Sequence, residues 1–311
     1  MTKKLLVTPA PHITKPTSAN IMMWAMIVAL LPTAISGVMM FGFNALYIML
    51  VSVGCSYVFD VLIMYSREKK FIWNDFSSIV TGLMVALVLP VTVPLYVPII
   101  GSFLAIVIFK GCFGGLGKNI FNPTAAARVV LGLIFTGLTL ELYTGTALGE
   151  NVASPLAYFV NGDYSTITLR SMFFGNVPGA IGTASILCIL VSGIVLMIFG
   201  ITEFVIPVGS IITFVATTWI GGGAISIVPF LFSGGFMFAT MFMITDPTTS
   251  PITVWGKLVY GLLYGLVAGL FRVFFIFGET SPFVAVLVVN LVAPLLDKIF
   301  APKPIGVRRR A

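Results

Sequence analysis

Apolar segments long enough to cross a lipid bilayer follow one another along most of this chain. Hydrophobic residues make up 59% of the 311 residues, charged residues make up 9%, and the mean hydropathy is +1.11. A soluble domain carries about 25% charged residues, so this chain lacks the polar side chains that would cover a water-facing surface. The sequence therefore predicts an integral membrane protein.

The apolar segments predict an all-α fold with about ten transmembrane helices, since a bilayer core needs about 20 apolar residues per helix. Several of them are joined by only a few residues, and those near 77–91 and 225–244 are short or interrupted by Gly and Pro. The predicted spans lie near residues 20–41, 43–65, 77–91, 93–110, 122–141, 178–199, 203–221, 225–244, 257–278 and 281–300.

The basic residues indicate the orientation of these spans. If the N-terminus lies in the cytoplasm, nearly all of the 17 basic residues fall on the inner side, as the positive-inside rule requires. This distribution follows membrane topology and gives no reason to expect a nucleic-acid partner. The predicted organisation is a cytoplasmic segment 1–19, a first membrane half 20–141, an outward loop 142–177, a second half 178–300 and a basic cytoplasmic tail 301–311.

The loop 142–177 is a candidate functional region, because loops longer than about 15 residues are usually functional or disordered. The rest of the composition excludes several classes of site. The chain has one histidine, His12, and its three cysteines, Cys55, Cys112 and Cys188, show no C-x-x-C spacing. This disfavours haem, zinc and a four-thiolate cluster, and we expect neither a metal site nor a catalytic side chain.

Two short polar sequences interrupt the apolar pattern at membrane depth. Asn122-Pro123 and Asp246-Pro247 fit poorly inside a helix, because proline lacks a backbone donor and biases the preceding residue away from helical angles. Each predicts a break before a helix, with Thr124, Thr248 and Ser250 as nearby hydroxyl side chains. Since helix N-termini attract anions, both breaks are candidate sites for a phosphate or a negatively charged flavin ring. Alternatively, Asn122 and Asp246 are ordinary helix caps.

The pair of breaks also favours an internal duplication into two related five-helix halves, because corresponding broken helices mark binding sites in many transport folds. The span count, however, does not place them at equivalent loops. Two charges within spans, Asp60 and Arg272, are further functional candidates. Asp60 could instead snorkel towards Arg67, and Arg272 could snorkel or pair with an anion.

The run Gly-Gly-Leu-Gly-Lys-Asn-Ile-Phe-Asn-Pro at 114–123, followed by Arg128-Val129-Val130-Leu131, is similar to the core motif of the D subunit of the Rnf complex. The same motif marks its relative, the B subunit of sodium-pumping NADH:quinone reductase. The resemblance extends over about residues 9–298. It continues in Ala-Pro-His at 10–12, Phe-Phe-Gly-Asn at 173–176, Thr-Asp-Pro-Thr-Thr-Ser-Pro at 245–251 and Asn-Leu-Val-Ala-Pro-Leu-Leu-Asp at 290–297.

The resemblance implies a membrane subunit of a redox-driven pump that carries electrons between ferredoxin and NAD, or another acceptor, coupled to Na+ or H+ translocation. Such a subunit is not catalytic alone. It implies a prokaryotic cytoplasmic (inner) membrane location with both termini inside. The implied partners are the cluster-bearing, flavoprotein and membrane subunits of the Rnf complex, ferredoxin indirectly, a flavin transferase and the lipid bilayer.

The resemblance also implies flavin. Family members carry FMN, joined by a phosphoester to a threonine of a Ser/Thr-Gly-Ala-Thr type motif in the outward loop, and some hold a second, non-covalent flavin such as riboflavin. This chain has no Ser-Gly-Ala-Thr. Spacing aligns Ser154, in Ser154-Pro155-Leu156, with the acceptor. A rival alignment uses Thr146 or Thr144, and a third alternative is no covalent flavin. The remaining candidate flavin contacts are Asn122, Thr124, Arg128, Asp246, Thr248 and Ser250.

A different class of function remains open from the residues alone. The two breaks and Asp60 also suit a non-redox solute or ion transporter of ten spans with its site at the breaks. Because both functions use the same architecture, the fold does not decide between them, whereas bound flavin does.

Overall fold

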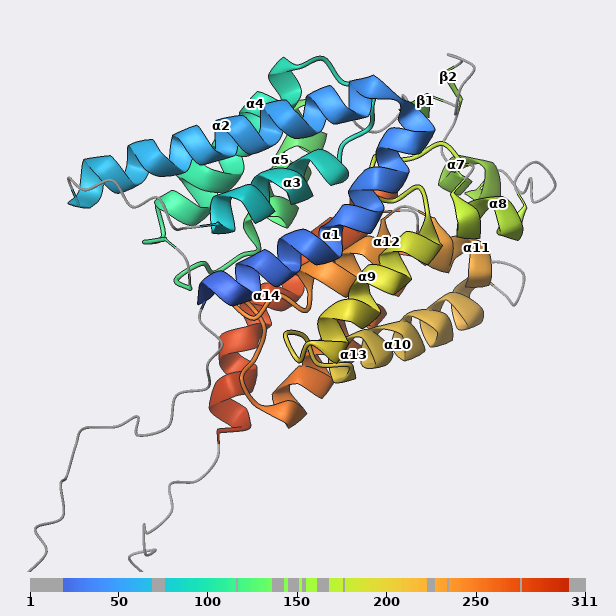
Figure 1. Ribbon diagram of the computed structural model, residues 1–311. Helices are drawn as coiled ribbons and strands as arrows, with labels where there is room; N and C mark the ends of the chain where they lie inside the picture. Colours follow the sequence, from blue (N-terminus) through green and yellow to red (C-terminus); the bar gives the residue numbers. More distant parts are fainter. Residues whose placement is uncertain are drawn as a thin grey trace, which may run out of the picture.

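The helices pack into one bundle in which α1 (Ala19–Phe41) lies between two groups, touching α3 (Ser77–Leu87) on one side and α9 (Ile186–Ile198) on the other (Figure 1). The computed structural model describes residues 19–68, 76–115, 117–135, 143–144, 151–152, 155–160, 168–175, 177–222, 227–233, 235–274 and 276–301.

The first group contains, besides α3, the long helix α2 and two helices that follow a break. Their bounds are α2 (Phe43–Glu68), α4 (Tyr96–Phe103), its π-helical continuation η1 (Leu104–Gly111) and α5 (Pro123–Ile134). The second group contains, besides α9, α10 (Val205–Gly222), α11 (Ile227–Phe232), α12 (Phe236–Phe238) with its π-helical continuation η3 (Ala239–Met243), α13 (Val254–Val273), η4 (Gly278–Thr280) and α14 (Ser281–Ile299).

The interval 142–177 between the groups is not purely irregular. It contains a two-stranded antiparallel hairpin of β1 (Tyr143–Thr144) and β2 (Asn151–Val152), followed by the short helices α7 (Pro155–Val160) and α8 (Leu169–Phe174). The all-α prediction therefore needs a small correction at this loop. The membrane part within the described residues is helical, as predicted.

Four helical segments within the described part are long and apolar enough to cross a membrane, namely 19–41, 43–67, 254–273 and 278–299. Other predicted spans are shorter or divided. The segment predicted at 77–91 stops being helical after Leu87, before Pro90 and Pro94, and the segment predicted at 225–244 divides at Gly235, whose φ is +71°. The expected interruption of these two segments by Gly and Pro is therefore confirmed, whereas the count of ten spans stays a prediction.

Two buried arginines hold the ends of short helices. Arg128 Nε donates to the carbonyl of Val88, the C-cap of α3, at 3.0 Å, and Arg272 Nη2 donates to the carbonyl of Ser233, just after α11, at 3.3 Å. Both arginines are 1% exposed. Helix ends leave carbonyls without partners, which is costly where water is absent. The snorkelling interpretation of Arg272 is therefore wrong, because its guanidinium is buried.

Helices α10 and α13 touch through backbone. Gly261, Gly265 and Gly269 repeat every fourth residue of α13, and a Cβ at any of them would collide with atoms of α10. We call these three residues the glycine seam. Small residues at this spacing let membrane helices approach closely. Across the seam, Thr213 Oγ1 donates to the carbonyl of Leu262 at 2.9 Å.

Candidate functional site

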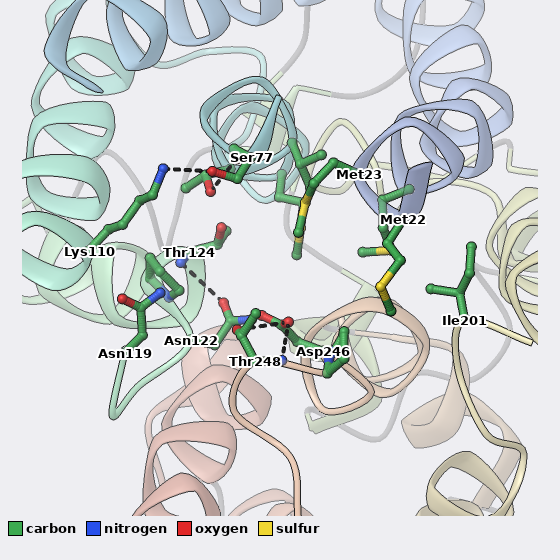
Figure 2. Close-up of a pocket in the computed structure, with 16 residues that line it drawn as sticks. Met22, Met23, Ser77, Lys110, Asn119, Asn122, Thr124, Ile201, Asp246 and Thr248 are labelled. Carbon is green, nitrogen blue, oxygen red and sulfur yellow. Dashed lines mark hydrogen bonds between the residues drawn. The ribbon is translucent and has the colours of Figure 1, made fainter. Parts of the chain in front are cut away.

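A pocket with about 560 Å3 of empty space, partly open to the outside, lies where the two predicted helix breaks meet (Figure 2). We call it the break pocket. α1 and α3 provide its apolar wall, which includes the methionines Met22, Met23, Met26 and Met84. Its polar lining consists of Ser77, Thr81, Lys110, Asn119, Asn122, Thr124, Asp246 and Thr248.

Asn122 anchors the first break. It is the N-cap of α5, with extended backbone angles of φ −62° and ψ 119°, and its Oδ1 accepts from the backbone N–H groups of Thr124 and Ala125 at 3.1 Å each. The prediction that Asn122 caps a helix is confirmed. Its Nδ2 is the donor to Asp246 Oδ2 at 3.2 Å, so the cap also links the two breaks across 124 residues of sequence.

Asp246 in the second break closes a turn and does not cap a helix. Its Oδ1 accepts from the backbone N–H of Thr248 at 3.0 Å and from the Thr248 hydroxyl at 2.9 Å, which closes a tight turn. The next helix, α13, starts at Val254 and is capped by Thr253. The alternative that Asp246 caps this helix is therefore wrong, because Pro247 and Pro251 delay helix formation.

Asn290 of α14 links the backbone of Asn122 to the hydroxyl of Tyr260 in α13 by hydrogen bonds. In the amide orientation that satisfies all its neighbours, Asn290 accepts from the backbone N–H of Asn122 at 2.7 Å and donates to the hydroxyl of Tyr260 at 2.6 Å. Both side chains are buried. Sequence reasoning missed this support, although a lone amide within the apolar run of α14 is a signal that could have found it.

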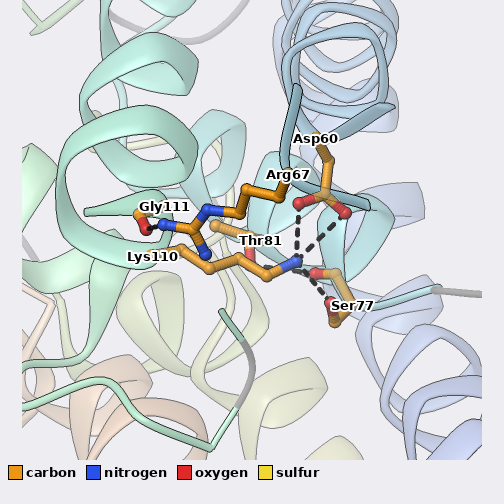
Figure 3. A network of polar contacts seen from close by, with 6 residues as sticks. All are labelled: Asp60, Arg67, Ser77, Thr81, Lys110 and Gly111. Carbon is orange, nitrogen blue, oxygen red and sulfur yellow. Dashed lines mark hydrogen bonds and ion pairs between the residues drawn. The ribbon is translucent and has the colours of Figure 1, made fainter. Parts of the chain in front are cut away.

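A buried ion pair borders the pocket on the side of η1 (Figure 3). Lys110 Nζ lies 3.0 and 3.1 Å from the two carboxylate oxygens of Asp60 and 2.7 Å from Ser77 Oγ. The two charged side chains are 3% and 8% exposed. Arg67, the partner considered for Asp60 from sequence, donates to the carbonyl of Gly111. The structure thus adds Lys110 as a partner that the sequence pattern did not indicate.

The break pocket collects some of the predicted flavin contacts and leaves others outside. Asn122, Thr124, Asp246 and Thr248 line it, whereas Arg128 and Ser250 do not. Arg128 instead holds the end of α3 and lies over the ring of Phe283, 5.8 Å from its centroid. Ser250 donates its backbone N–H to the Asp246 carbonyl at 3.1 Å.

The proposed covalent acceptors lie in the interval 142–177. Ser154 and Thr146 fall outside the described residues, and Thr144 belongs to β1. Ser154 stands in sequence between β2 and α7, and its assignment as the FMN acceptor stays a prediction.

The fold and the break pocket define a multi-pass membrane protein with a polar pocket between interrupted helices. Within that class, the chain belongs to the NQR2, RnfD, RnfE family, whose model matches residues 6–306. This match confirms the resemblance found in the sequence.

Relatives in this family match the chain over nearly its whole length. It is 31% identical to the D subunit of the "Proton-translocating ferredoxin:NAD(+) oxidoreductase complex" of Clostridium ljungdahlii, covering 97% of this chain and 96% of that protein. It is also 31% identical to the D subunit of the "Na(+)-translocating ferredoxin:NAD(+) oxidoreductase complex" of Acetobacterium woodii, covering 98% and 96%. The D subunit of the "Ion-translocating oxidoreductase complex" of Haemophilus influenzae is 30% identical, covering 97% and 98%.

Proposed function

We propose that this chain is the D subunit of an Rnf-type ion-translocating ferredoxin:NAD(+) oxidoreductase and carries electrons through the membrane part of that complex. The near full-length similarity to the D subunits of such complexes carries this proposal. Because one such relative is named for protons and another for Na+, the similarity is equally compatible with either ion. In this role the chain resides in a prokaryotic cytoplasmic membrane and works with the cluster-bearing and flavoprotein subunits.

Within this role, the break pocket binds a flavin non-covalently. Asn119 lines the pocket, is 9% exposed, and its Oδ1 has no hydrogen-bond partner among the described residues. A buried amide oxygen without a donor is costly, and a ring N–H of a flavin is a suitable donor.

The other lining residues match the rest of such a ligand. The methionines of α1 and α3 offer a polarizable apolar surface for a flat aromatic ring system. Asn122 and Thr248 are held in place by their bonds to Asp246, so they present fixed polar groups. When bound, the flavin supplies the capacity to accept and release electrons, while the protein orients it and excludes water.

The same proposal includes FMN attached through a phosphoester in the interval 142–177. A hydroxyl side chain provides the ester oxygen, and Ser154 is the favoured acceptor, with Thr146 as the alternative. The support is the alignment with the family motif, since neither residue is described.

Covalent attachment is tested by expressing the complex with its flavin transferase and viewing a denaturing gel under ultraviolet light. Fluorescence of this chain should survive denaturation and disappear in Ser154→Ala. Ser165→Ala, in the same loop, is the matched control and should keep the signal. Loss of fluorescence in Thr146→Ala, with Ser154→Ala unchanged, would move the acceptor to Thr146.

Non-covalent flavin is tested by denaturing the purified complex and measuring the flavin released from it. Asn119→Leu should release less flavin than the unchanged complex, whereas Asn44→Leu, which changes an exposed asparagine of α2, should release the same amount. An intact complex that contains neither released nor attached flavin at this chain would contradict the proposal. That result would favour a non-redox transporter with its site at the breaks.

A further inference from the structure

Lys110 lies between the Asp60 carboxylate and the break pocket. Its ammonium contacts the Asp60 carboxylate and the Ser77 hydroxyl, and its side chain also lines the break pocket (Figures 2 and 3). It belongs to the last turn of η1 and is 3% exposed. The same cation is therefore part of a buried ion pair and part of the pocket wall.

The charges around the pocket are few. Among the described lining residues, Lys110 and Asp246 are the ones with ionisable side chains, and Asp60 lies directly behind Lys110. Because charges interact strongly where little water is present, a cation at this position affects the energy of further negative charge in the pocket.

A buried ion pair is weak evidence for stability, because desolvation of both charges opposes their attraction. Apolar residues of similar volume often serve as well or better at such positions. The position of Lys110 in the pocket wall gives the pair another role, since an electron that reaches the pocket brings one negative charge to a place beside a fixed cation.

We propose that Lys110 stabilises the negative charge that enters the break pocket with an electron, and that Asp60 limits this stabilisation by holding the ammonium at the pocket edge. The inference rests on the proposed flavin in this pocket. In the step considered, the preceding electron carrier of the complex loses one electron and the pocket gains one. No covalent bond forms or breaks, and Lys110 keeps its protons. Lys110 thus acts through its positive charge and exchanges neither a proton nor an electron with the ligand.

The test is a charge series in the purified complex: Lys110→Met, Asp60→Asn, and the two changes combined. The midpoint potential of the non-covalent flavin is measured by spectroelectrochemical titration, as a difference from the Asn119→Leu complex, in which we expect less of this flavin. Lys110→Met should disfavour the reduced state at least tenfold, or 59 mV for one electron. Asp60→Asn should shift the potential in the opposite direction. The combined variant should lie between the two single variants.

Two further measurements keep the outcomes separate. Lys110→Arg should retain the potential of the unchanged protein, because it keeps the positive charge. If Lys110→Met fails to assemble, the upward shift in Asp60→Asn and the unchanged potential in Lys110→Arg still test the inference. The inference would be overturned if the midpoint potential shifted in the same direction in both single variants, or did not shift in Asp60→Asn. The ion pair would then have a structural role. Absence of released flavin from the unchanged complex would instead overturn the flavin site itself, and this inference with it.

Discussion

The glycine seam and the break pocket are two contacts between helices that are built in opposite ways. In the seam, α10 and α13 meet backbone to backbone, and a side chain at Gly261, Gly265 or Gly269 would collide with the opposite helix. In the break pocket, helices end, polar side chains fill the junction and a cavity remains. The seam has no room for a ligand, whereas the pocket leaves space beside its polar groups.

This difference separates stability from binding. Without a hydrophobic drive in lipid, helix association depends on close packing and hydrogen bonds, which the glycine seam supplies. The pocket interrupts that packing and must hold its polar groups by specific bonds, chiefly between Asn122 and Asp246. We expect changes in the seam to affect folding first, and changes in the pocket to affect flavin binding first.

The largest effect should come from Gly265→Leu. The added side chain would meet the Ser210 carbonyl and the Thr213 hydroxyl, so the helices must separate, at a cost of about 3 kcal/mol. The midpoint of thermal unfolding in detergent and the yield of assembled complex should both fall. Gly54→Leu, where nothing lies near the added Cβ, is the control. An unchanged unfolding midpoint in Gly265→Leu would refute the role given to the seam.

Asn122→Ala should have the next largest effect on stability and a larger one on flavin. It removes the cap of α5 and the bond to Asp246, each worth about 1 kcal/mol. Flavin released from the complex should decrease strongly. Asn122→Ser separates the two contributions, since serine can cap the helix but lacks the amide that reaches Asp246. Equal flavin content in the alanine variant and the unchanged protein would contradict the site.

Asp246→Asn should cost less. An amide oxygen still accepts from Thr248, but the bonds lose their charge assistance, which we expect to cost about 1 kcal/mol. Removing this negative charge should raise the midpoint potential of the pocket flavin. The control is Asp297→Asn, because Asp297 also accepts from a backbone N–H, that of Ile252, and does not line the pocket. A lower potential in Asp246→Asn would contradict the charge argument.

Thr213→Val should have the smallest effect. It removes one interhelical hydrogen bond across the seam, to the Leu262 carbonyl, while keeping the shape of the side chain. Such bonds contribute about 0.6 kcal/mol in membrane proteins, so the unfolding midpoint should fall slightly and flavin content should not change. A decrease in flavin would show that the seam and the pocket are coupled.

The sequence predicted the helical membrane part and both breaks, because long apolar runs and proline after Asn or Asp act locally. It did not predict that the breaks touch, since Asn122 and Asp246 are 124 residues apart and only tertiary packing joins them. The sequence places Lys110 among the basic residues on the cytoplasmic side, because a positive residue after an apolar run usually lies in water. Its burial depends on Asp60, which lies 50 residues earlier in the chain.

The arginines that hold the ends of α3 and α11 have a consequence for the order of synthesis. Val88 precedes Arg128 by 40 residues, and Ser233 precedes Arg272 by 39. At about 5–20 residues per second, each short helix is made roughly 2–8 s before the guanidinium that covers its end exists. During that delay its terminal carbonyls must be satisfied by water or by the insertion machinery. Each of these two helix ends therefore acquires its buried donor only when its arginine has been made.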